Sequence, residues 1–135
     1  MPRVQSNPMN VLSLVSGEDL TSSQYYAVQM DADAREIKVA GTPAAEGAHV
    51  LGVLQNDPDE GEEAAVATAG TSRLVMAANC SIGEKIMSSS GKGTPADGDQ
   101  KSVIGLALTA NAEGDGGYIE VLITPGGVAQ ADESN

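Results

Sequence analysis

Short apolar runs separated by glycine, proline and aspartate dominate the chain from residue 24 onward. The runs are five to nine residues long, and in the last of them Ile119, Val121 and Ile123 alternate with other side chains. Such runs, bounded by turn residues, are typical of strands, and no stretch keeps a good 3.6-residue period. The sequence predicts strands at residues 24–30, 36–40, 49–55, 63–69, 72–78, 84–89, 102–110 and 118–124. The one helical feature predicted is a short turn after Gly17, capped by Ser16.

Several short sequences occur twice, in the same order and with offsets of 52 or 53 residues. The pairs are Gly41-Thr42-Pro43-Ala44 with Gly93-Thr94-Pro95-Ala96, Val50-Leu51-Gly52-Val53 with Val103-Ile104-Gly105-Leu106, and Glu60-Gly61 with Glu113-Gly114. We therefore expect a mostly β fold, a small β-barrel or sandwich built from two similar hairpin-containing halves at about residues 26–70 and 85–126. The alternative is chance similarity in a chain rich in alanine and glycine.

The repeat also makes local predictions. The Gly-Thr-Pro-Ala sequences are expected to be turns, because proline and glycine punctuate strands. Gly52 and Gly105 lie in the middle of apolar runs, where glycine marks a bulge or a close approach of another backbone. We expect one of these two features at both positions.

The first seventeen residues contain no acidic side chain, in contrast to the acidic sequence that follows. We interpret residues 1–17 as an extended N-terminal arm, residues 18–126 as a single β domain and residues 127–135 as a flexible C-terminal tail. A free arm would leave its apolar residues in water, so these are candidates for binding a partner. They are Met9, Val11, Leu12, Leu14 and Val15. The alternative is that this segment is the first strand of the domain itself.

Charge restricts the classes of partner. The chain has 19 Asp and Glu against 7 Lys and Arg, a formal net charge of -12. That balance opposes binding to nucleic acid and to anionic membranes, which attract basic surfaces. No apolar run is long enough to cross a membrane as a helix, and no signal peptide is recognisable, so we expect a soluble protein that is not secreted by that route. A core without Phe or Trp, with three Tyr, favours an oligomer.

The sequence offers no catalytic constellation, and we predict that the protein is not an enzyme. The single His49 excludes sites that need two imidazoles, and no Gly-x-Ser-x-Gly motif is present. Cys80 is expected to be a small buried apolar residue and His49 a surface or interface group. Ser90-Gly91-Lys92-Gly93-Thr94 is similar to a phosphate-binding loop but lacks the first glycine of that motif. No cofactor is predicted.

Acidic clusters raise the question of a metal. The segment 31–36 begins like a calcium loop, but Glu36 occupies the position that requires glycine. Residues 57–63 and 97–99 have enough carboxylates to hold a divalent ion, although solvated turns are the usual explanation for such runs. We predict no metal site and keep weak binding in these loops as an alternative.

From about Gly17 to Pro125, the chain resembles the capsid cement, or head decoration, proteins of tailed bacteriophages. The sequences that carry the resemblance are Gly17-Glu18-Asp19-Leu20, Tyr25-Tyr26-Ala27-Val28, Gly52-Val53-Leu54-Gln55-Asn56-Asp57-Pro58, Ile82-Gly83-Glu84-Lys85-Ile86, Ile104-Gly105-Leu106-Ala107-Leu108 and Ile119-Glu120-Val121-Leu122-Ile123. These sequences belong to strands and turns and identify no active site.

The resemblance implies a small β-rich protein, a homotrimer, that is made in the host cytoplasm and binds the outer surface of a phage head. There it would clamp adjacent subunits of the major capsid protein and stabilise the expanded shell. An extended arm would suit this role, because a strand can add to an exposed sheet edge of a neighbour. Two alternatives remain: another structural protein of the virion, in the tail or baseplate, or a small acidic β-barrel that binds calcium or another ligand.

Overall fold

The computed structural model describes residues 9–30, 36–39, 49–96 and 103–124, and these form strands and turns without a helix. The strands are β1 (Asn10–Ser16), β2 (Ala27–Met30), β3 (Glu36–Val39), β4 (Gly52–Leu54), β5 (Glu63–Val75), β6 (Lys85–Ser89), β7 (Lys92–Pro95), β8 (Val103–Ala107) and β9 (Tyr118–Ile123). The predicted mostly β fold is thus confirmed. None of the described residues forms a helix long and apolar enough to cross a membrane.

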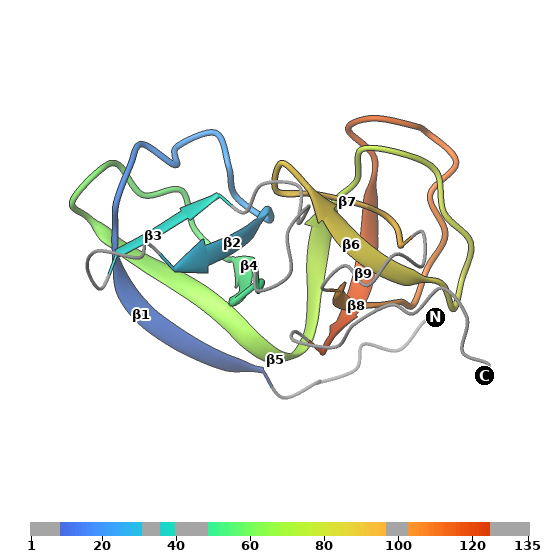
Figure 1. Cartoon of the computed structure of the whole chain (residues 1–135), viewed down its shortest axis with the longest axis horizontal. Coiled ribbons are helices and arrows are strands. Elements are labelled where there is room, and N and C mark those ends of the chain that lie inside the picture. Colours follow the sequence, from blue (N-terminus) through green and yellow to red (C-terminus); the bar gives the residue numbers. More distant parts are fainter. Residues whose placement is uncertain (1–8, 31–35, 40–48, 97–102, 125–135) are drawn as a thin grey trace, which may run out of the picture.

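The longest strand, β5, joins the two halves of the fold (Figure 1). Its first half, residues 63–69, pairs with β1 and β4, and its second half, residues 70–75, pairs with β9. Gly70 lies where the partners change and has a φ of 95°, a conformation that glycine adopts without steric cost. The sequence predicts separate strands at 63–69 and 72–78. That prediction was wrong, because Gly70 bends one strand instead of ending it.

The first half of the molecule is a closed ring of strands. Around this ring, which we call the first barrel, the order is β1, β3, β2, β4 and the first half of β5. The first half of β5 pairs back with β1 in antiparallel register from Asn10 to Val15, and β1 pairs with β3 in parallel through Val15 and Ser16. Residues 10–16 are therefore the first strand of the domain, which is the alternative interpretation of this segment.

The second half repeats this arrangement. The second half of β5, β9, β8, β6 and β7 follow one another, and Met76, directly after β5, forms a parallel bridge with Gly93 of β7. We call this ring the second barrel. In it the second half of β5 has the place that β1 has in the first barrel: parallel to one neighbour and antiparallel to the other.

Backbone hydrogen bonds show the correspondence residue by residue. Gly17 donates to the carbonyl of Ile37, and Ala77 donates in the same way to Gly93. Gly61 donates to Ser16, and Gly116 donates to Met76. Gly61 thus corresponds to Gly116, and matching Glu60-Gly61 with Glu113-Gly114 was wrong, because the second loop carries extra residues before the return strand. In the structure, each barrel also includes one strand that precedes its sequence repeat: β1 lies before residue 26, and the second half of β5 lies before residue 85.

The prediction for the mid-strand glycines is confirmed as a close backbone approach. A Cβ on Gly52 would lie 2.1 Å from the carbonyl oxygen of Ala67, and a Cβ on Gly105 would lie 1.9 Å from that of Leu122. Each glycine lets its strand approach the backbone of the neighbouring strand more closely than a side chain would allow. The two glycines hold equivalent places in the two barrels.

Tyr25 and Gly83 also hold equivalent places in the two barrels, but one has a large side chain and the other has none. Tyr25 donates its backbone N–H to Leu54, and Gly83 donates to Ala107. Both have a positive φ, 69° for Tyr25 and 90° for Gly83. This backbone conformation is free of cost for glycine and costs another L-residue about 1–2 kcal/mol. The first barrel therefore has a strained tyrosine where the second barrel has an unstrained glycine.

Two predictions of local structure were wrong. Gly93-Thr94-Pro95 is part of β7 and not a turn; the turn is Ser90-Gly91, both with positive φ, which is the two-residue geometry that matches strand twist. Pro95 is tolerated because β7 is the last strand in the sheet order. After Gly17 there is no helical turn: the Ser16 hydroxyl donates to the Glu18 carbonyl at 2.6 Å instead of accepting from a helix N-terminus. Residues 41–44, 97–99 and 127–135 lie outside the described residues.

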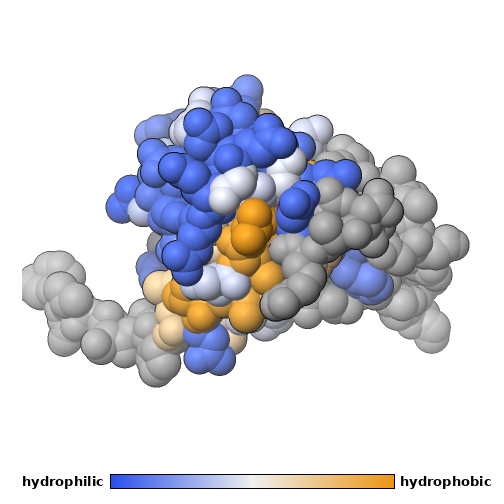
Figure 2. All heavy atoms as spheres, turned by 90° about the vertical axis from the view of Figure 1, so that its left-hand side faces the viewer, coloured by the Kyte–Doolittle hydropathy of each residue, from blue (hydrophilic) through white to orange (hydrophobic). Residues whose placement is uncertain are grey.

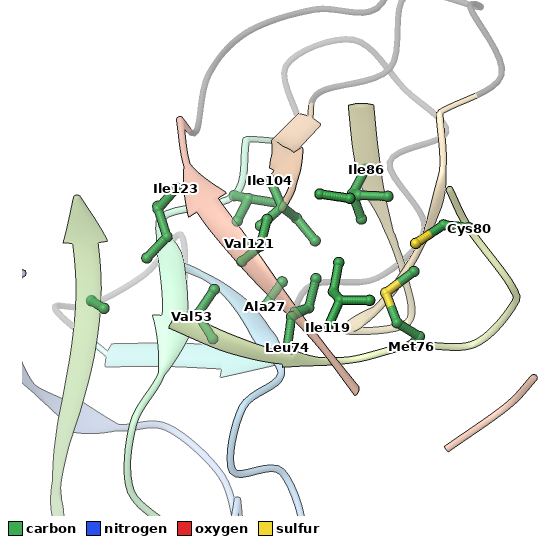
Figure 3. Close-up of a cluster of buried hydrophobic side chains, with 13 residues drawn as sticks. Ala27, Val53, Leu74, Met76, Cys80, Ile86, Ile104, Ile119, Val121 and Ile123 are labelled. Atoms are coloured by element: carbon green, nitrogen blue, oxygen red, sulfur yellow. The ribbon is translucent and has the colours of Figure 1, made fainter. Parts of the chain in front are cut away.

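Two apolar clusters form the core. The smaller fills the first barrel and consists of Leu20, Val28, Ile37, Leu54, Ala64 and Val66. The larger fills the second barrel and includes Leu74, Met76, Ile86, Ile104, Ile119 and Val121, together with Ala27 and Val53 from the outer face of the first barrel (Figure 3). Since alternate residues of β4 contribute to different clusters, Val53 to the larger and Leu54 to the smaller, the two barrels pack against each other as one body.

Candidate functional site

The predicted partner-binding residues lie on or beside β1, and most are exposed. Val11 is 52% exposed, Val15 46%, Leu12 43% and Met9 41%. Leu14 is different: it is partly buried and packs on the apolar cluster of the first barrel. Four of the five candidates therefore present apolar surface to solvent, and the fifth holds the strand on the barrel.

The register of β1 explains this distribution. Residues that pair directly share a face of the sheet. Leu12 pairs with Val66, which is fully buried in the first barrel, so Leu12 and Leu14 belong to the inner face. Val11 and Val15 alternate with them and belong to the outer face. Figure 2, viewed from the side on which β1 lies, shows an apolar patch in the lower part of a largely hydrophilic face.

The backbone of β1 also has a partly unpaired edge. One edge pairs with β5 from Asn10 to Val15, whereas on the other, among the described strands, only Val15 and Ser16 pair, with β3. Over the paired strands β1 and β5 lies a hollow of about 440 Å³ lined by Ser13, Leu14, Val15, Gly61 and Glu63. Unpaired strand backbone next to apolar side chains is the arrangement that β-strand addition uses. We call Met9, Val11, Leu12 and Val15 with this edge the β1 surface.

A cluster that the sequence analysis missed lies at the junction of the barrels. The rings of Tyr25 and Tyr118 are 6.3 Å apart and nearly perpendicular. The guanidinium carbon of Arg73 lies 5.4 Å from the centroid of each ring, within the range of a cation–π contact. These residues are far apart in sequence and come from a turn, β5 and β9, so no local motif signals them. Their scarcity is the one available hint, since the chain has three aromatic residues in all.

The acidic loop after β4 uses its carboxylates to hold its own turn. Glu62 accepts a hydrogen bond from the Asp59 amide at 2.8 Å, and Asp59 accepts one from the Glu60 amide at 2.7 Å. Within the part of the chain that the structure describes, no three Asp, Glu, His or Cys side chains lie close enough together to hold a metal ion. Asp31, Asp33, Asp97 and Asp99 lie outside that part.

Cys80 is buried in the larger apolar cluster, as predicted, and His49 is exposed. Burial raises the pKa of the Cys80 thiol, with a further contribution from the negative charge of Glu84. A raised pKa means less thiolate, the reactive form, at a given pH. We therefore expect slow alkylation by iodoacetamide at pH 8 in the native protein and rapid alkylation in urea, followed by mass spectrometry. Equal rates in both states would contradict the burial of this thiol.

Comparison with known proteins finds no matching family model and no curated protein with a matching sequence. Among solved structures, the head fiber gp8.5 N base of bacteriophage phi29 is similar to this chain, with a TM-score of 0.59 and 17% sequence identity. The match covers 87% of this chain and 95% of that one. The likeness is therefore one of fold, over nearly the whole length of both chains.

Proposed function

We propose that this chain is a structural protein of a bacteriophage head that binds the outer surface of the capsid. Bound there, it clamps adjacent subunits of the major capsid protein and so stabilises the expanded shell. The observation that carries the proposal is the β1 surface, which combines half-exposed apolar side chains with strand backbone that no described strand pairs from Asn10 to Leu14 on one edge. The fold shared with a phage head fiber base and the sequence resemblance to cement proteins support the assignment to the head.

The mechanism is stabilisation by binding, without chemistry. A protein that binds the expanded lattice more tightly than the precursor shell shifts the equilibrium towards the expanded form by the difference in binding free energy. Val11 and Val15 would enter pockets of a capsid subunit while the free edge of β1 adds to one of its strands. We further propose a homotrimer, in which three such contacts act together and raise the overall affinity.

The direct test is binding to purified capsids. We expect the protein to co-sediment with expanded shells and to bind unexpanded shells more weakly. Equal binding to both would contradict stabilisation of the expanded form, and no binding to either would remove the capsid assignment. Mass spectrometry of separated heads and tails distinguishes a tail or baseplate protein, because a decoration protein is expected in heads at high copy number.

The β1 surface is tested by a double substitution, Val11→Ser with Val15→Ser. Both side chains are about half-exposed on the outer face, so the melting temperature is expected to change little. Capsid affinity is expected to fall at least tenfold, because about 1 kcal/mol of apolar burial is lost at each position. Ile82→Ser is the matched control: Ile82 is 70% exposed and lies in the turn before β6, away from β1. A loss of binding no greater than that of the control would contradict the proposed surface.

A further inference from the structure

A second groove, of about 470 Å³, lies beside the cluster of Tyr25, Arg73 and Tyr118. Its lining includes Thr71, Thr109 and Glu120, and it extends to Met9 at the start of the β1 surface. Gln55 and Ser72 also line it and are hydrogen-bonded to each other at 2.9 Å. Tyr118 is 52% exposed, and the rings and the guanidinium are accessible from solvent. Tyrosine and arginine are the side chains most enriched where interfaces derive their binding energy.

The comparison of the two barrels shows that the fold does not require this tyrosine. At the equivalent position in the second barrel, Gly83 makes the same backbone hydrogen bond, and a Cβ there would meet nothing within 4 Å. The position therefore needs a left-handed backbone and no side chain. In the first barrel Tyr25 adopts this conformation despite its strain, and its ring lies against Arg73 and Tyr118. Strain of this kind is typical of binding sites.

Arg73 is the side chain in this cluster that can bind an anionic group. Among the described residues, no carboxylate lies within 4 Å of its guanidinium, although Glu120 is its direct partner across the β5–β9 pair. The guanidinium carbon lies over both rings, and the N–H groups make no hydrogen bond with the described residues, so they are available to a ligand. A guanidinium presents these donors in a planar fork that fits the two oxygens of a carboxylate.

We infer that Arg73, held against Tyr25 and Tyr118, binds a carboxylate side chain from an extended acidic segment of a partner protein. The two rings fix the guanidinium so that little side-chain freedom is lost on binding, and the hydroxyls of Thr71 and Thr109 along the groove contact the peptide on either side. The high negative charge of the chain and the carboxylate of Glu120 in the groove itself oppose such a ligand, so binding depends on the local geometry of Arg73. The inference concerns a site beyond the β1 surface and stands without the capsid assignment.

The test is an NMR titration of the isotope-labelled full chain with two peptides. One is acetyl-Gly-Glu-Gly-Glu-Gly-amide and the other has glutamine in place of both glutamates. With the first peptide we expect saturable shifts at the Arg73 side-chain N–H and at the Tyr25 and Tyr118 rings, with a dissociation constant in the millimolar range. The glutamine peptide is expected to bind at least tenfold more weakly. Equal shifts with both peptides, or shifts confined to other parts of the chain, would overturn the inference.

Two variants separate binding from folding. Tyr25→Gly keeps the backbone conformation that Gly83 shows is compatible with the fold, and Arg73→Gln removes the charge from an exposed position. Both are expected to fold, to keep a melting temperature close to that of the parent chain, and to bind the glutamate peptide at least tenfold more weakly. Lys85→Gln, which removes an exposed positive charge elsewhere, is expected to leave the affinity within twofold. Unchanged affinity in Tyr25→Gly and Arg73→Gln would show that the cluster only joins the barrels.

Discussion

Replacing Gly105 by alanine is expected to destabilise the protein by about 3 kcal/mol or more. The added Cβ would lie 1.9 Å from the carbonyl oxygen of Leu122 and 3.1 Å from the amide nitrogen of Thr124. Both atoms belong to the backbone, so no side chain can rotate away and β8 must move from β9. The free energy of unfolding from urea denaturation would measure this loss. Gly52→Ala is expected to behave similarly, because its Cβ would lie 2.1 Å from the Ala67 carbonyl oxygen.

Gly83→Ala is the matched control for this effect. Gly83 has a positive φ, but a Cβ there would meet no atom within 4 Å. Alanine at this position is expected to cost about 1 kcal/mol through backbone strain alone. If Gly105→Ala were no more destabilising than Gly83→Ala, the close crossing of β8 and β9 would not be what requires glycine at residue 105.

A variant lacking residues 1–17 is expected to lose the first barrel. Removing β1 breaks six residue pairs with β5 and two with β3, and it takes Leu14 away from the apolar cluster. At about 1 kcal/mol for each backbone hydrogen bond, the loss is on the order of 5 kcal/mol, which is comparable to the whole stability of many domains. Hydrogen exchange followed by NMR is expected to show unprotected amides in β2, β3 and β4. A variant lacking residues 1–8 retains all of β1 and serves as the control.

This expectation affects how capsid binding is tested. A truncated chain that fails to bind capsids could fail because its first barrel is open. The substitutions Val11→Ser and Val15→Ser avoid this ambiguity, because both side chains lie on the outer face of an intact strand. If the variant lacking residues 1–17 instead melted cooperatively at the temperature of the parent chain, β1 would be an accessory strand, and the interpretation of this segment as an arm would be strengthened.

Local patterns predicted much of the strand content. Each predicted strand has a counterpart in the structure, because alternation of apolar side chains over a few residues is a local property. Gly52 and Gly105 were interpreted correctly for the same reason. Two of the errors fell where one residue type has two uses: Gly70 bends a strand that it was expected to end, and Pro95 lies in a strand at the end of the sheet order. Which use applies depends on the neighbouring strands.

The candidate surfaces could likewise be predicted only in part from the sequence. The apolar residues of β1 stood out in the sequence, but their pairing with β5, which decides that Val11 is exposed while Leu14 packs inward, involves residues about fifty positions away. Tyr25, Arg73 and Tyr118 carry no shared motif, and only the packing of the two barrels brings them together.

The sequence by itself determined that this is a β protein of strongly acidic surface, with glycine where strands cross and an apolar N-terminal strip. These properties follow from side-chain chemistry and from the two-residue period of strands. The tertiary structure alone decided the partner of each strand edge, the closure of two barrels on a shared β5 and the assembly of the arginine–tyrosine cluster. The reason is physical: a strand edge offers the same backbone donors and acceptors to every neighbour, so the choice among neighbours depends on packing across the whole chain.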